Sequence, residues 1–520
     1  MTIELSKRKI LFGLLLGTLL SGCASLAPPI ERSLQTTPAI QNETDLDRVI
    51  AEKLEPFPGE SGAHYLNDGL DAFAARLAGV DRASRSIDAQ YYLFHDDTTG
   101  KLLAQRLLLA ADRGVAVRLL LDDIGVQGRD EDLLALHAHP NIGVRIFNPF
   151  ANRRFRLFEY LYRFGVVTRR MHNKSMIIDG VVAIAGGRNV GDEYYDAHEA
   201  SNFLDMDVMI FGPAVQAISD QYDEYWNSPL SYSIDELAKT PITSAQAKTK
   251  WTQLSQYTEA QQDSIYLERL RETPIFDHLQ SGTLPLAVAP ALVLSDRPEK
   301  VRLPLDDDST HLGPALWPLF REVSDELLIF NPYFIPGDQG VAALAEAVRQ
   351  GGRVIVLTNS LASNDVAVVH GHYAKYRKPL LRAGVEIYEL KVDRPASSSS
   401  GAVGEIEASH MSLHVKTFVF DRKKTFIGSL NLDPRSVYQN TELGIVVEDA
   451  RMAGQIAALA LEQLPDIAYQ VGLDEDGNLF WLGRDPNTQQ ITRYQREPEA
   501  SLVQRILAAV SRVLPVEGQL

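Results

Sequence analysis

Two stretches of nine residues decide the fold predicted for this chain. Residues 171–179 read MHNKSMIID, and residues 413–421 read LHVKTFVFD. In both, a histidine precedes a lysine by two positions, and an aspartate follows the lysine by five. Because alternate residues of a β-strand point to the same face, each histidine should share a face with its lysine, above a strand buried by the apolar residues that follow. A single pair of this kind is commonly a chance occurrence on a surface strand, whereas two pairs with identical spacing predict a functional site.

The agreement continues beyond the aspartates. Residues 186–189 read GGRN and residues 428–431 read GSLN, so a glycine lies seven positions and an asparagine ten positions after each aspartate. Glycine lets the backbone approach a ligand closely, and an asparagine amide can donate to a phosphate oxygen. The candidate site residues of the two motifs are His172, Lys174, Asp179 and Asn189, and His414, Lys416, Asp421 and Asn431.

The segments around the motifs also repeat. Strand-like runs alternate with helix-like runs in both halves, which predicts an α/β layer fold. Equivalent residues lie at a nearly constant separation: 241 for Tyr92 and Tyr333, 237 for Gly114 and Gly351, 241 for Gly143 and Gly384, and 242 for His172 and His414. We infer an internal duplication.

The duplication predicts a division of the chain into five parts. They are a lipoprotein signal peptide (residues 1–22), a tether rich in proline and polar residues (23–60), a first half (61–230), a mostly helical connector (231–284) and a second half with a C-terminal extension (285–520).

The N-terminus predicts a lipid anchor. Three basic residues (7–9) precede an apolar run (10–20) that is too short to cross a bilayer, followed by Leu20-Ser21-Gly22-Cys23. This resembles the bacterial lipobox, in which the cysteine is acylated, and Ala24 after it resembles the outer-membrane sorting pattern. The alternative is a buried, unreactive Cys23 behind an ordinary signal. The prediction is a lipid-anchored protein of the cell envelope that faces the periplasm, on the outer more than the inner membrane.

The motif pattern resembles the phospholipase D superfamily. The resemblance covers about residues 60–230 and 285–470, and the residues around the motifs (187–192, 433–436 and 440–442) are similar to those of bacterial cardiolipin synthases, most of all the C type. It implies a bilobed fold of two α/β/α sandwich halves, with the active site at their pseudo-twofold interface.

The resemblance also implies a carboxylate for each histidine. The matching positions are Glu442 and Asp205, which we expect to pair across the twofold axis with His172 and His414, respectively. Asp207 shares a strand face with Asp205 and is an alternative. Asp179 and Asp421 complete the motifs, although in this arrangement they more often have a structural role.

Two facing imidazoles can divide the labour of displacement at phosphorus. One forms a phosphohistidine and the other protonates the leaving alcohol. The family resemblance makes His172 the nucleophile and His414 the general acid, whereas the two sequences alone are almost symmetric. The lysines and asparagines would neutralise the phosphate oxygens, and no cofactor or metal ion is expected.

A basic and aromatic segment before the first motif predicts membrane contact. Arg153, Arg154 and Arg156 are interleaved with aromatic and apolar residues in a chain of net charge −17. We expect these arginines to engage anionic headgroups. The alternative is an amphipathic helix packed on the core.

The predicted function is a membrane-anchored phosphatidyltransferase that makes cardiolipin from phosphatidylglycerol and a second phospholipid. The alternatives are a phospholipase D that releases phosphatidic acid and, from another class, an inactive lipoprotein scaffold. The net charge of −17 and the lipid anchor argue against a nucleic-acid partner. The predicted partners are therefore phospholipid substrates and a bacterial membrane.

Overall fold

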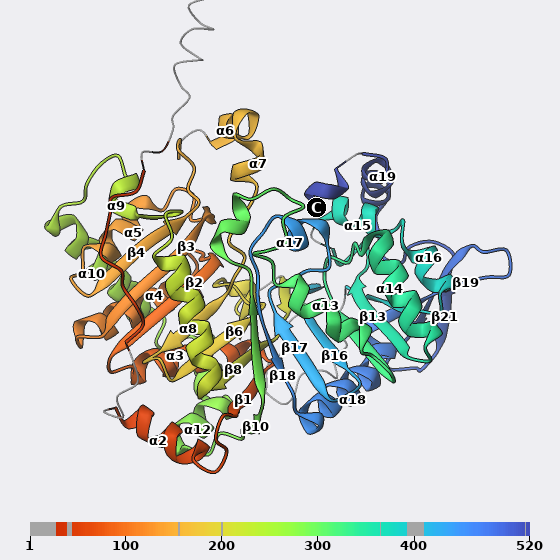
Figure 1. The fold of residues 1–520 in the computed structure, drawn as a ribbon, viewed down its shortest axis with the longest axis horizontal. Helices are drawn as coiled ribbons and strands as arrows, with labels where there is room; N and C mark the ends of the chain where they lie inside the picture. Colours follow the sequence, from red (N-terminus) through yellow and green to blue (C-terminus); the bar gives the residue numbers. More distant parts are fainter. Residues whose placement is uncertain are drawn as a thin grey trace, which may run out of the picture.

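The molecule consists of two large β-sheets side by side, each covered by helices (Figure 1). It is known from a computed structural model, which describes residues 26, 28–38, 44–153, 156–198, 201–364, 366–392, 410–514 and 516–520. Cys23 and the signal segment lie outside the described residues.

The first sheet has nine strands among the described residues, in the order β10-β1-β8-β6-β5-β2-β3-β4-β9. They are β1 (Ser61–Leu66), β2 (Ser86–Leu93), β3 (Ala116–Gly125), β4 (Ile142–Phe147), β5 (Ser175–Ile178), β6 (Val182–Gly186), β8 (Asp207–Phe211), β9 (Ser231–Ser233) and β10 (Ala287–Ala289). Strands β2, β3 and β4 are parallel, and β5 is antiparallel to β2. The start of β5 therefore lies at the carboxyl ends of the parallel strands.

The second sheet has ten strands in the described part of the chain, in the order β11-β18-β17-β16-β12-β13-β14-β19-β20-β21. They are β11 (Ala291–Ser295), β12 (Glu326–Phe330), β13 (Arg353–Asn359), β14 (Glu386–Leu390), β16 (Thr417–Phe420), β17 (Lys424–Gly428), β18 (Leu443–Val447), β19 (Ala468–Leu473), β20 (Leu479–Arg484) and β21 (Ile491–Tyr494). Its first seven strands repeat the order β1-β8-β6-β5-β2-β3-β4 of the first sheet. This topology confirms the predicted duplication.

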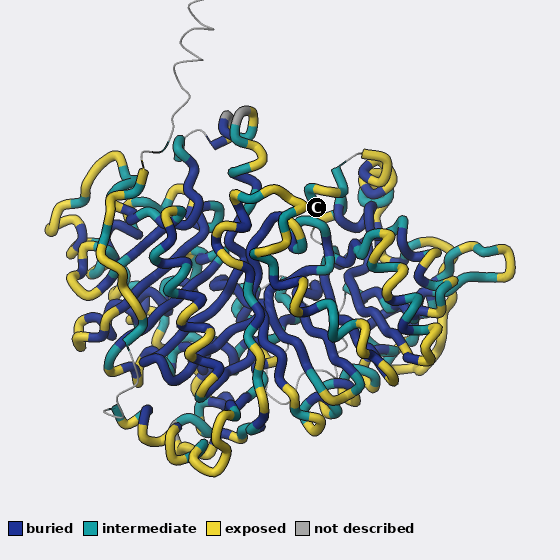
Figure 2. The backbone as a smooth tube through the Cα atoms, in the orientation of Figure 1, coloured by how far each residue is buried: buried dark blue, intermediate teal, exposed yellow. Residues whose placement is uncertain are grey.

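Helices cover both faces of each sheet. On the first sheet, α3 (Gly69–Arg82) and α4 (Thr98–Asp112) pack on one face and α8 (Pro213–Trp226) on the other. Because side chains alternate along a strand, Ile178 of β5 points to the face covered by α3 and α4, whereas Ile177 points to the face covered by α8. On the second sheet, α14 (Gly337–Arg349) and α18 (Ala450–Ile467) take the corresponding places. The central strands of both sheets are buried on both faces, and Figure 2 shows them as the dark interior.

The two halves share a hydrophobic core. Ala183 and Val208 of the first sheet lie in one buried cluster with Ile427 and Ile445 of the second, and α8 contacts β11. The halves are therefore fused along β6, β8, β17 and β18.

The connector is mostly helical, as predicted. Its helices are α9 (Ile234–Leu237), α10 (Ser244–Ala260), α11 (Ile265–Arg271) and α12 (Pro274–Ser281). The boundary of the second half needs a small correction, because β10, which was assigned to that half, pairs with β1 of the first sheet.

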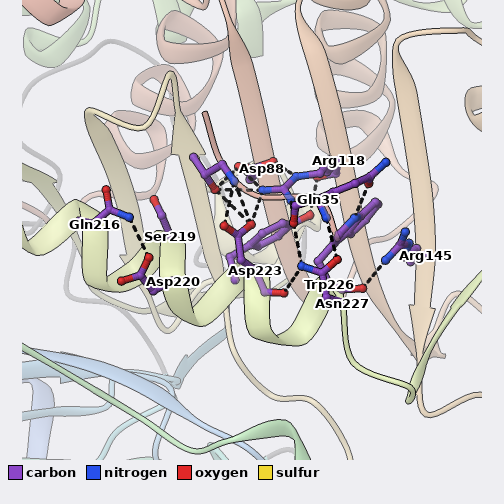
Figure 3. A network of polar contacts seen from close by, with 12 residues as sticks. Gln35, Asp88, Arg118, Arg145, Gln216, Ser219, Asp220, Asp223, Trp226 and Asn227 are labelled. Carbon is purple, nitrogen blue, oxygen red and sulfur yellow. Dashed lines mark hydrogen bonds and ion pairs between the residues drawn. The ribbon is translucent and has the colours of Figure 1, made fainter. Parts of the chain in front are cut away.

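The prediction of a structureless tether over residues 23–60 is wrong for much of that segment. Helix α2 (Asp45–Leu54) starts with a capping box at Thr44 and buries Ile50. Residues 28–38 lie along α8, where Arg118 joins Asp88 and Asp223 to Gln35 and Thr37 (Figure 3). Proline-rich composition did not reveal this, because the partners lie 51 to 206 residues away in sequence.

Candidate active site

The histidine and lysine of each motif lie just before a short strand. Ser175, the first residue of β5, pairs with Gln90 near the carboxyl end of β2, and Thr417 of β16 pairs with Phe330 at the end of β12. Both motifs therefore present their histidines at the carboxyl edge of the parallel strands, which is where open α/β sheets place ligands.

His172 is held by the second half of the chain. Met171 forms a parallel bridge with Thr441, and the His172 backbone N–H donates to the Thr441 carbonyl at 2.9 Å. The next residue of the second half, Glu442, places Oε2 2.8 Å from His172 Nδ1. On the opposite side, Asp122 accepts the Met171 N–H and pairs with the buried Arg170, which fixes the approach to the histidine.

His414 is held in the same way by the first half. Strand β15 (His410–Leu413) pairs in parallel with β7 (Ser201–Leu204), and the His414 N–H donates to the Leu204 carbonyl at 2.7 Å. Asp205 follows directly, with Oδ2 2.5 Å from His414 Nδ1. The predicted pairing of His172 with Glu442 and His414 with Asp205 is thus confirmed as a pair of contacts across the two halves.

The alternative carboxylate, Asp207, serves another purpose. Its side chain forms a buried ion pair with Arg76 at 2.8 Å and accepts the Arg188 backbone N–H. It lies on β8 and orders the strand beneath the site, so the structure decides between the two aspartates in favour of Asp205.

The two carboxylates differ in their surroundings. A Cβ at Gly187 would lie 2.1 Å from Asp205 Oδ1, so only glycine leaves room for this carboxylate. At the equivalent position of the second half, the Ser429 hydroxyl donates to Glu442 Oε2. The second glycine of the first motif therefore makes space, whereas the serine of the second motif supplies a hydrogen bond.

The lysines share one geometry. Lys174 Nζ donates to the His172 carbonyl and Lys416 Nζ to the His414 carbonyl, each at 2.5 Å. Both side chains are buried beside the imidazoles. Burial lowers the pKa of Lys174 well below its ordinary value, although Glu442 and Asp205 attract its positive charge. A phosphate entering the site would supply the missing countercharge.

Burial keeps both imidazoles neutral. Desolvation and then the lysine charges lower the pKa of His172 well below its usual range and that of His414 to about 4. With Nδ1–H donating to a carboxylate, Nε2 of each ring carries its lone pair into the site.

The partner carboxylates are shifted in opposite directions. Burial raises the pKa of Glu442 to about 7, against the attraction of Lys174 and the Ser429 hydrogen bond. Burial would also raise the pKa of Asp205, but His414 and Lys416 outweigh it and hold that pKa below its ordinary value. This difference breaks the near-symmetry of the two motifs.

Asp179 and Asp421 do not reach the site. Each lies at the far end of its strand and accepts three consecutive backbone N–H groups, from residues 84–86 and 324–326, respectively. Both have positive φ, which aspartate tolerates in tight turns. The catalytic candidacy of these two residues is therefore corrected to the structural role noted as the alternative.

The two asparagines are not equivalent. The Asn189 side chain accepts the Leu93 N–H and donates to the Tyr194 hydroxyl, so part of its capacity is used within the protein. Asn431 is buried, and its side-chain oxygen has no hydrogen-bond partner in the described part of the chain. Because amide and phosphate oxygens both accept hydrogen bonds, the expected phosphate contact would have to come from the amide nitrogen of Asn431.

Aromatic side chains around the histidines were missed by the sequence analysis. The Tyr92 ring meets His172 edge-on with centroids 5.0 Å apart, and Tyr194 and Phe203 flank His414 at 5.2 Å. Tyr92 lies on β2 and Phe203 on β7, whereas Tyr194 ends a short 3-10 helix (Asp192–Tyr194). Local periodicity does not show which aromatic residue turns toward a distant histidine.

The predicted headgroup contacts of Arg153 and Arg156 are wrong. Both guanidinium groups pair with buried Asp123, and Arg153 also pairs with Asp130 at 2.5 Å. They anchor the start of α6 (Arg156–Tyr162) to the end of β3, so the alternative of a helix held on the core is favoured. Arg154 lies outside the described residues.

One group of side chains has the composition of a metal site. Among the described residues, His95, Asp97 and Glu193 bring one ligand atom each within 4.8 Å of one another. Asp97 already accepts the Gly100 and Asp192 backbone N–H groups as the cap of α4. None of the three belongs to the motifs.

A duplicated α/β fold with two facing histidine–lysine pairs defines a phospholipase D-type enzyme. The family model described as "Cardiolipin synthase, PLD-like domain" matches residues 77–227 and 317–462. The chain is 42% identical over 464 residues to cardiolipin synthase C of Escherichia coli strain K12, which covers 88% of this chain and 96% of that protein. The chain belongs to the phospholipase D-like cardiolipin synthase family.

Two further proteins resemble the chain over most of its length. An uncharacterised protein of Helicobacter pylori is 32% identical over 506 residues, which cover 97% of this chain and 96% of that protein. The crystal structure of a phosphatidylserine synthase from Haemophilus influenzae has a TM-score of 0.56 at 12% identity and covers 91% of this chain and 100% of that one, a likeness of fold. The chain is thus an enzyme, a phospholipase D-type phosphatidyltransferase.

Proposed function

We propose that the chain makes cardiolipin, by transferring a phosphatidyl group from one phospholipid to the hydroxyl of phosphatidylglycerol through a phosphohistidine. The observation that carries the proposal is the pair of neutral, buried imidazoles, each with Nδ1 on a carboxylate of the other half. This arrangement supplies one nucleophile and one proton carrier for the same phosphorus atom.

The reaction takes two balanced steps. His414, neutral in the absence of substrate, takes up a proton from solvent on Nε2 as the anionic phosphodiester binds. His172 Nε2 then attacks phosphorus, the bond to the donor headgroup breaks, and the leaving alkoxide takes this Nε2 proton from His414. The acceptor hydroxyl then gives its proton to His414 and attacks the same phosphorus, which releases His172 Nε2. Lys174 and Lys416 offset the negative charge of the phosphate oxygens in both transition states.

The assignment of His172 as nucleophile rests on the family resemblance and has support from the carboxylates. A phosphorylated His172 keeps its proton on Nδ1, beside Glu442, whose pKa of about 7 lets this residue adjust its charge near neutral pH. His414 must carry a proton during the first step, and Asp205, which stays ionised, stabilises that imidazolium.

A transferase is favoured over a hydrolase by the enclosure of the site. His172 and His414 are 8% and 7% exposed, and aromatic rings flank both. A site that limits water gives a lipid alcohol an advantage as acceptor. Hydrolysis to phosphatidic acid is the second candidate.

The membrane attachment is part of the proposal. Among the described residues, no helix is long and apolar enough to cross a bilayer. We infer that acylated Cys23, after removal of residues 1–22, anchors the enzyme to the cell envelope on the periplasmic side, at the outer membrane more than the inner. Multiple acyl chains suffice for stable anchoring.

The deciding experiment incubates the purified chain with labelled phosphatidylglycerol and phosphatidylethanolamine and separates the lipid products. Labelled cardiolipin is the expected result. Phosphatidic acid alone would replace the transferase with a phospholipase D, and no product with any combination of donor and acceptor would leave an inactive scaffold.

A further inference from the structure

The C-terminal helix turns small side chains toward the protein and large apolar side chains toward solvent. Helix α19 (Leu502–Ser511) buries Ala508 and Ser511, and a Cβ at Gly371 of α15 (Ala367–Tyr373) would lie 2.1 Å from the Ser511 hydroxyl oxygen. Small residues thus form the contact with the protein. The large apolar residues of α19 and the turn after it face solvent: Leu502, Val503, Ile506, Leu507, Val510, Val513 and Leu514.

The five of these residues that belong to α19 form one stripe. Successive residues of an α-helix are rotated by 100°, so positions 502, 503, 506, 507 and 510 fall within less than half of the helix circumference. Leu502 and Val503 are 70% and 65% exposed. A helix of a monomeric soluble protein normally turns such a stripe to the core.

A second exposed apolar element lies at the same edge of the molecule. Leu157 and Leu161 of α6 are 80% and 82% exposed, and Phe164 at the start of α7 (Phe164–Val167) is also exposed. Figure 1 shows α6 and α19 projecting from one edge, with α17 (Pro434–Tyr438) between them, and Figure 2 shows exposed chain on both.

This edge is next to the catalytic histidines. Arg435 of α17 donates to the Thr168 carbonyl, four residues before His172, and its backbone N–H donates to the carbonyl of Leu520 at the C-terminus. Helix α17 therefore links α7 on one side to the C-terminal segment on the other. Glu442 follows α17 by four residues, so the apolar elements flank the approach to the site.

The described chain also begins at this edge. The Ile30 N–H donates to Glu236 of α9, which Figure 1 places at the same side as α6. Cys23 precedes Pro28, the start of the described run 28–38, by five residues, which span at most about 18 Å when fully extended. An acyl chain on Cys23 would reach the bilayer that covers this edge.

We propose that α6–α7 and α19 form a membrane-docking face, which inserts Leu157, Leu161, Ile506 and Leu507 into a phospholipid bilayer and seats the active site on its surface. The inference rests on the proposed function, because the substrates it names reside in bilayers. Helix α19 has no acidic residue, and Arg512 follows it, so the face suits anionic phospholipids in an otherwise acidic protein.

The first test measures the depth of single labels in the full chain. The Cys23→Ser background removes the one native cysteine, and Ile506→Cys, Leu161→Cys or Leu459→Cys then carries a polarity-sensitive fluorophore. Leu459 is 48% exposed, against 53% for Ile506, and it belongs to α18, which Figure 1 shows at the opposite edge of the molecule. It is therefore a matched control.

Vesicles of phosphatidylglycerol and phosphatidylethanolamine with nitroxide-labelled acyl chains should quench the fluorophore at 506 and 161 but not at 459. Equal quenching at 459, or none at 506 and 161, overturns the proposal. Because the readout is local, attachment through the N-terminus does not produce it.

The second test compares two physical forms of the substrate. Ile506→Gln with Leu507→Gln should lower turnover on vesicles by about tenfold or more, since two apolar side chains lose their insertion. Turnover of a monomeric short-chain phosphatidylglycerol should stay the same, and Leu459→Gln should change neither. Unchanged turnover on vesicles overturns the docking face.

Two outcomes separate this inference from its alternatives. If the native chain turns over neither substrate form, the proposed function fails, while the label depths still decide the docking face. If sedimentation shows a dimer that Ile506→Gln with Leu507→Gln dissolves, and vesicles leave the labels unquenched, the face is an interface between copies and the proposal is overturned.

Discussion

At the scale of single residues, the two histidines have matching contacts, but the carboxylates that they contact lie in different surroundings. Each imidazole is fixed by a backbone hydrogen bond and a carboxylate from the other half. The carboxylates differ, because Ser429 donates to Glu442 whereas Gly187 only makes room for Asp205. The same scaffold can therefore give two histidines different tasks, in the way that neighbouring carboxyl groups acquire different roles from their surroundings.

The division of tasks predicts unequal effects of the two histidine substitutions. His172→Ala removes the proposed nucleophile and should abolish turnover of every phosphatidyl donor. His414→Ala removes the proposed general acid, and the loss with a natural headgroup should be about 10²- to 10⁴-fold. A donor with an acidic phenol as leaving group should recover phosphoenzyme formation in the His414→Ala chain alone. Acid-quench trapping of labelled phosphoprotein measures this, and equal recovery in both variants would contradict the assignment.

The raised pKa of Glu442 predicts a pH-dependent stability cost. An unfolded glutamate ionises near pH 4.5, whereas this carboxyl resists ionisation up to about pH 7 in the folded chain. The folded state thus loses stability relative to the unfolded state as the pH rises from 4.5 to 7, by about 1.4 kcal/mol per pKa unit at most. Across this pH window, the melting temperature of the Glu442→Gln chain should rise relative to that of the native chain. Above about pH 7, the difference between the two melting temperatures should stay constant.

A surface carboxylate provides the control for this measurement. Glu475 is exposed in the turn between β19 and β20, so Glu475→Gln should follow the native chain at every pH. A flat difference between Glu442→Gln and the native chain from pH 4.5 to 8 would contradict the raised pKa.

Residue-level prediction from sequence succeeded where a motif occurs twice. The histidines and lysines followed from the repeated spacing, whereas the histidine–carboxylate pairs followed from the family resemblance alone. The contacts of Tyr92, Tyr194 and Arg153 were missed or misassigned, because they depend on side-chain neighbours that are distant in sequence.

At the scale of elements, the two sheets share one order of seven strands and differ in the strands at their edges. The parallel strands β2–β4 and β12–β14 and the mostly helical connector were predictable, because apolar runs and helical periodicity identify them locally. The segment 28–38 was not, because an extended chain without periodicity is defined by its partners. Those partners, Asp88, Arg118 and Asp223, are polar residues of β2, β3 and α8.

The hydrogen bonds that hold residues 28–38 predict that this segment can be released without unfolding the core. Thr37→Val removes donors and acceptors toward Asp88, Asp223 and Arg118, and Gln35→Ala removes the acceptor of the Trp226 indole N–H. Each lost hydrogen bond is worth about 0.5–1.5 kcal/mol. The double variant should be cleaved at least about tenfold faster within residues 28–43 by a protease, as a loss of about 1.4 kcal/mol implies.

The exposed Ser33 offers the comparison. Ser33→Ala should be cleaved at the native rate, and the melting temperature of the core should change by only a few degrees in either variant. A double variant as resistant as the native chain would show that the segment is held by other contacts.

At the scale of the whole molecule, the two halves are fused through a shared core, so a single chain contains the complete active site. The shared core of β6, β8, β17 and β18 fixes the two motifs relative to each other, and the pairs β7–β15 and Met171–Thr441 cross between the halves. A sequence can reveal that two motifs exist, but only the packing shows that each half completes the other. Substituting a crossing residue should therefore disturb both histidines.

Completion within one chain predicts that two defective chains cannot rescue each other. A His172→Ala chain retains His414, and a His414→Ala chain retains His172, but the surviving histidine of each faces a site that lacks its counterpart. A mixture, or co-expression in one cell, should show no more cardiolipin synthesis than the sum of the separate variants. Each variant should melt near the temperature of the native chain, because the shared core is intact. Recovery of about a quarter or more of the native rate on co-expression would require exchange of halves between chains, which the continuous core opposes.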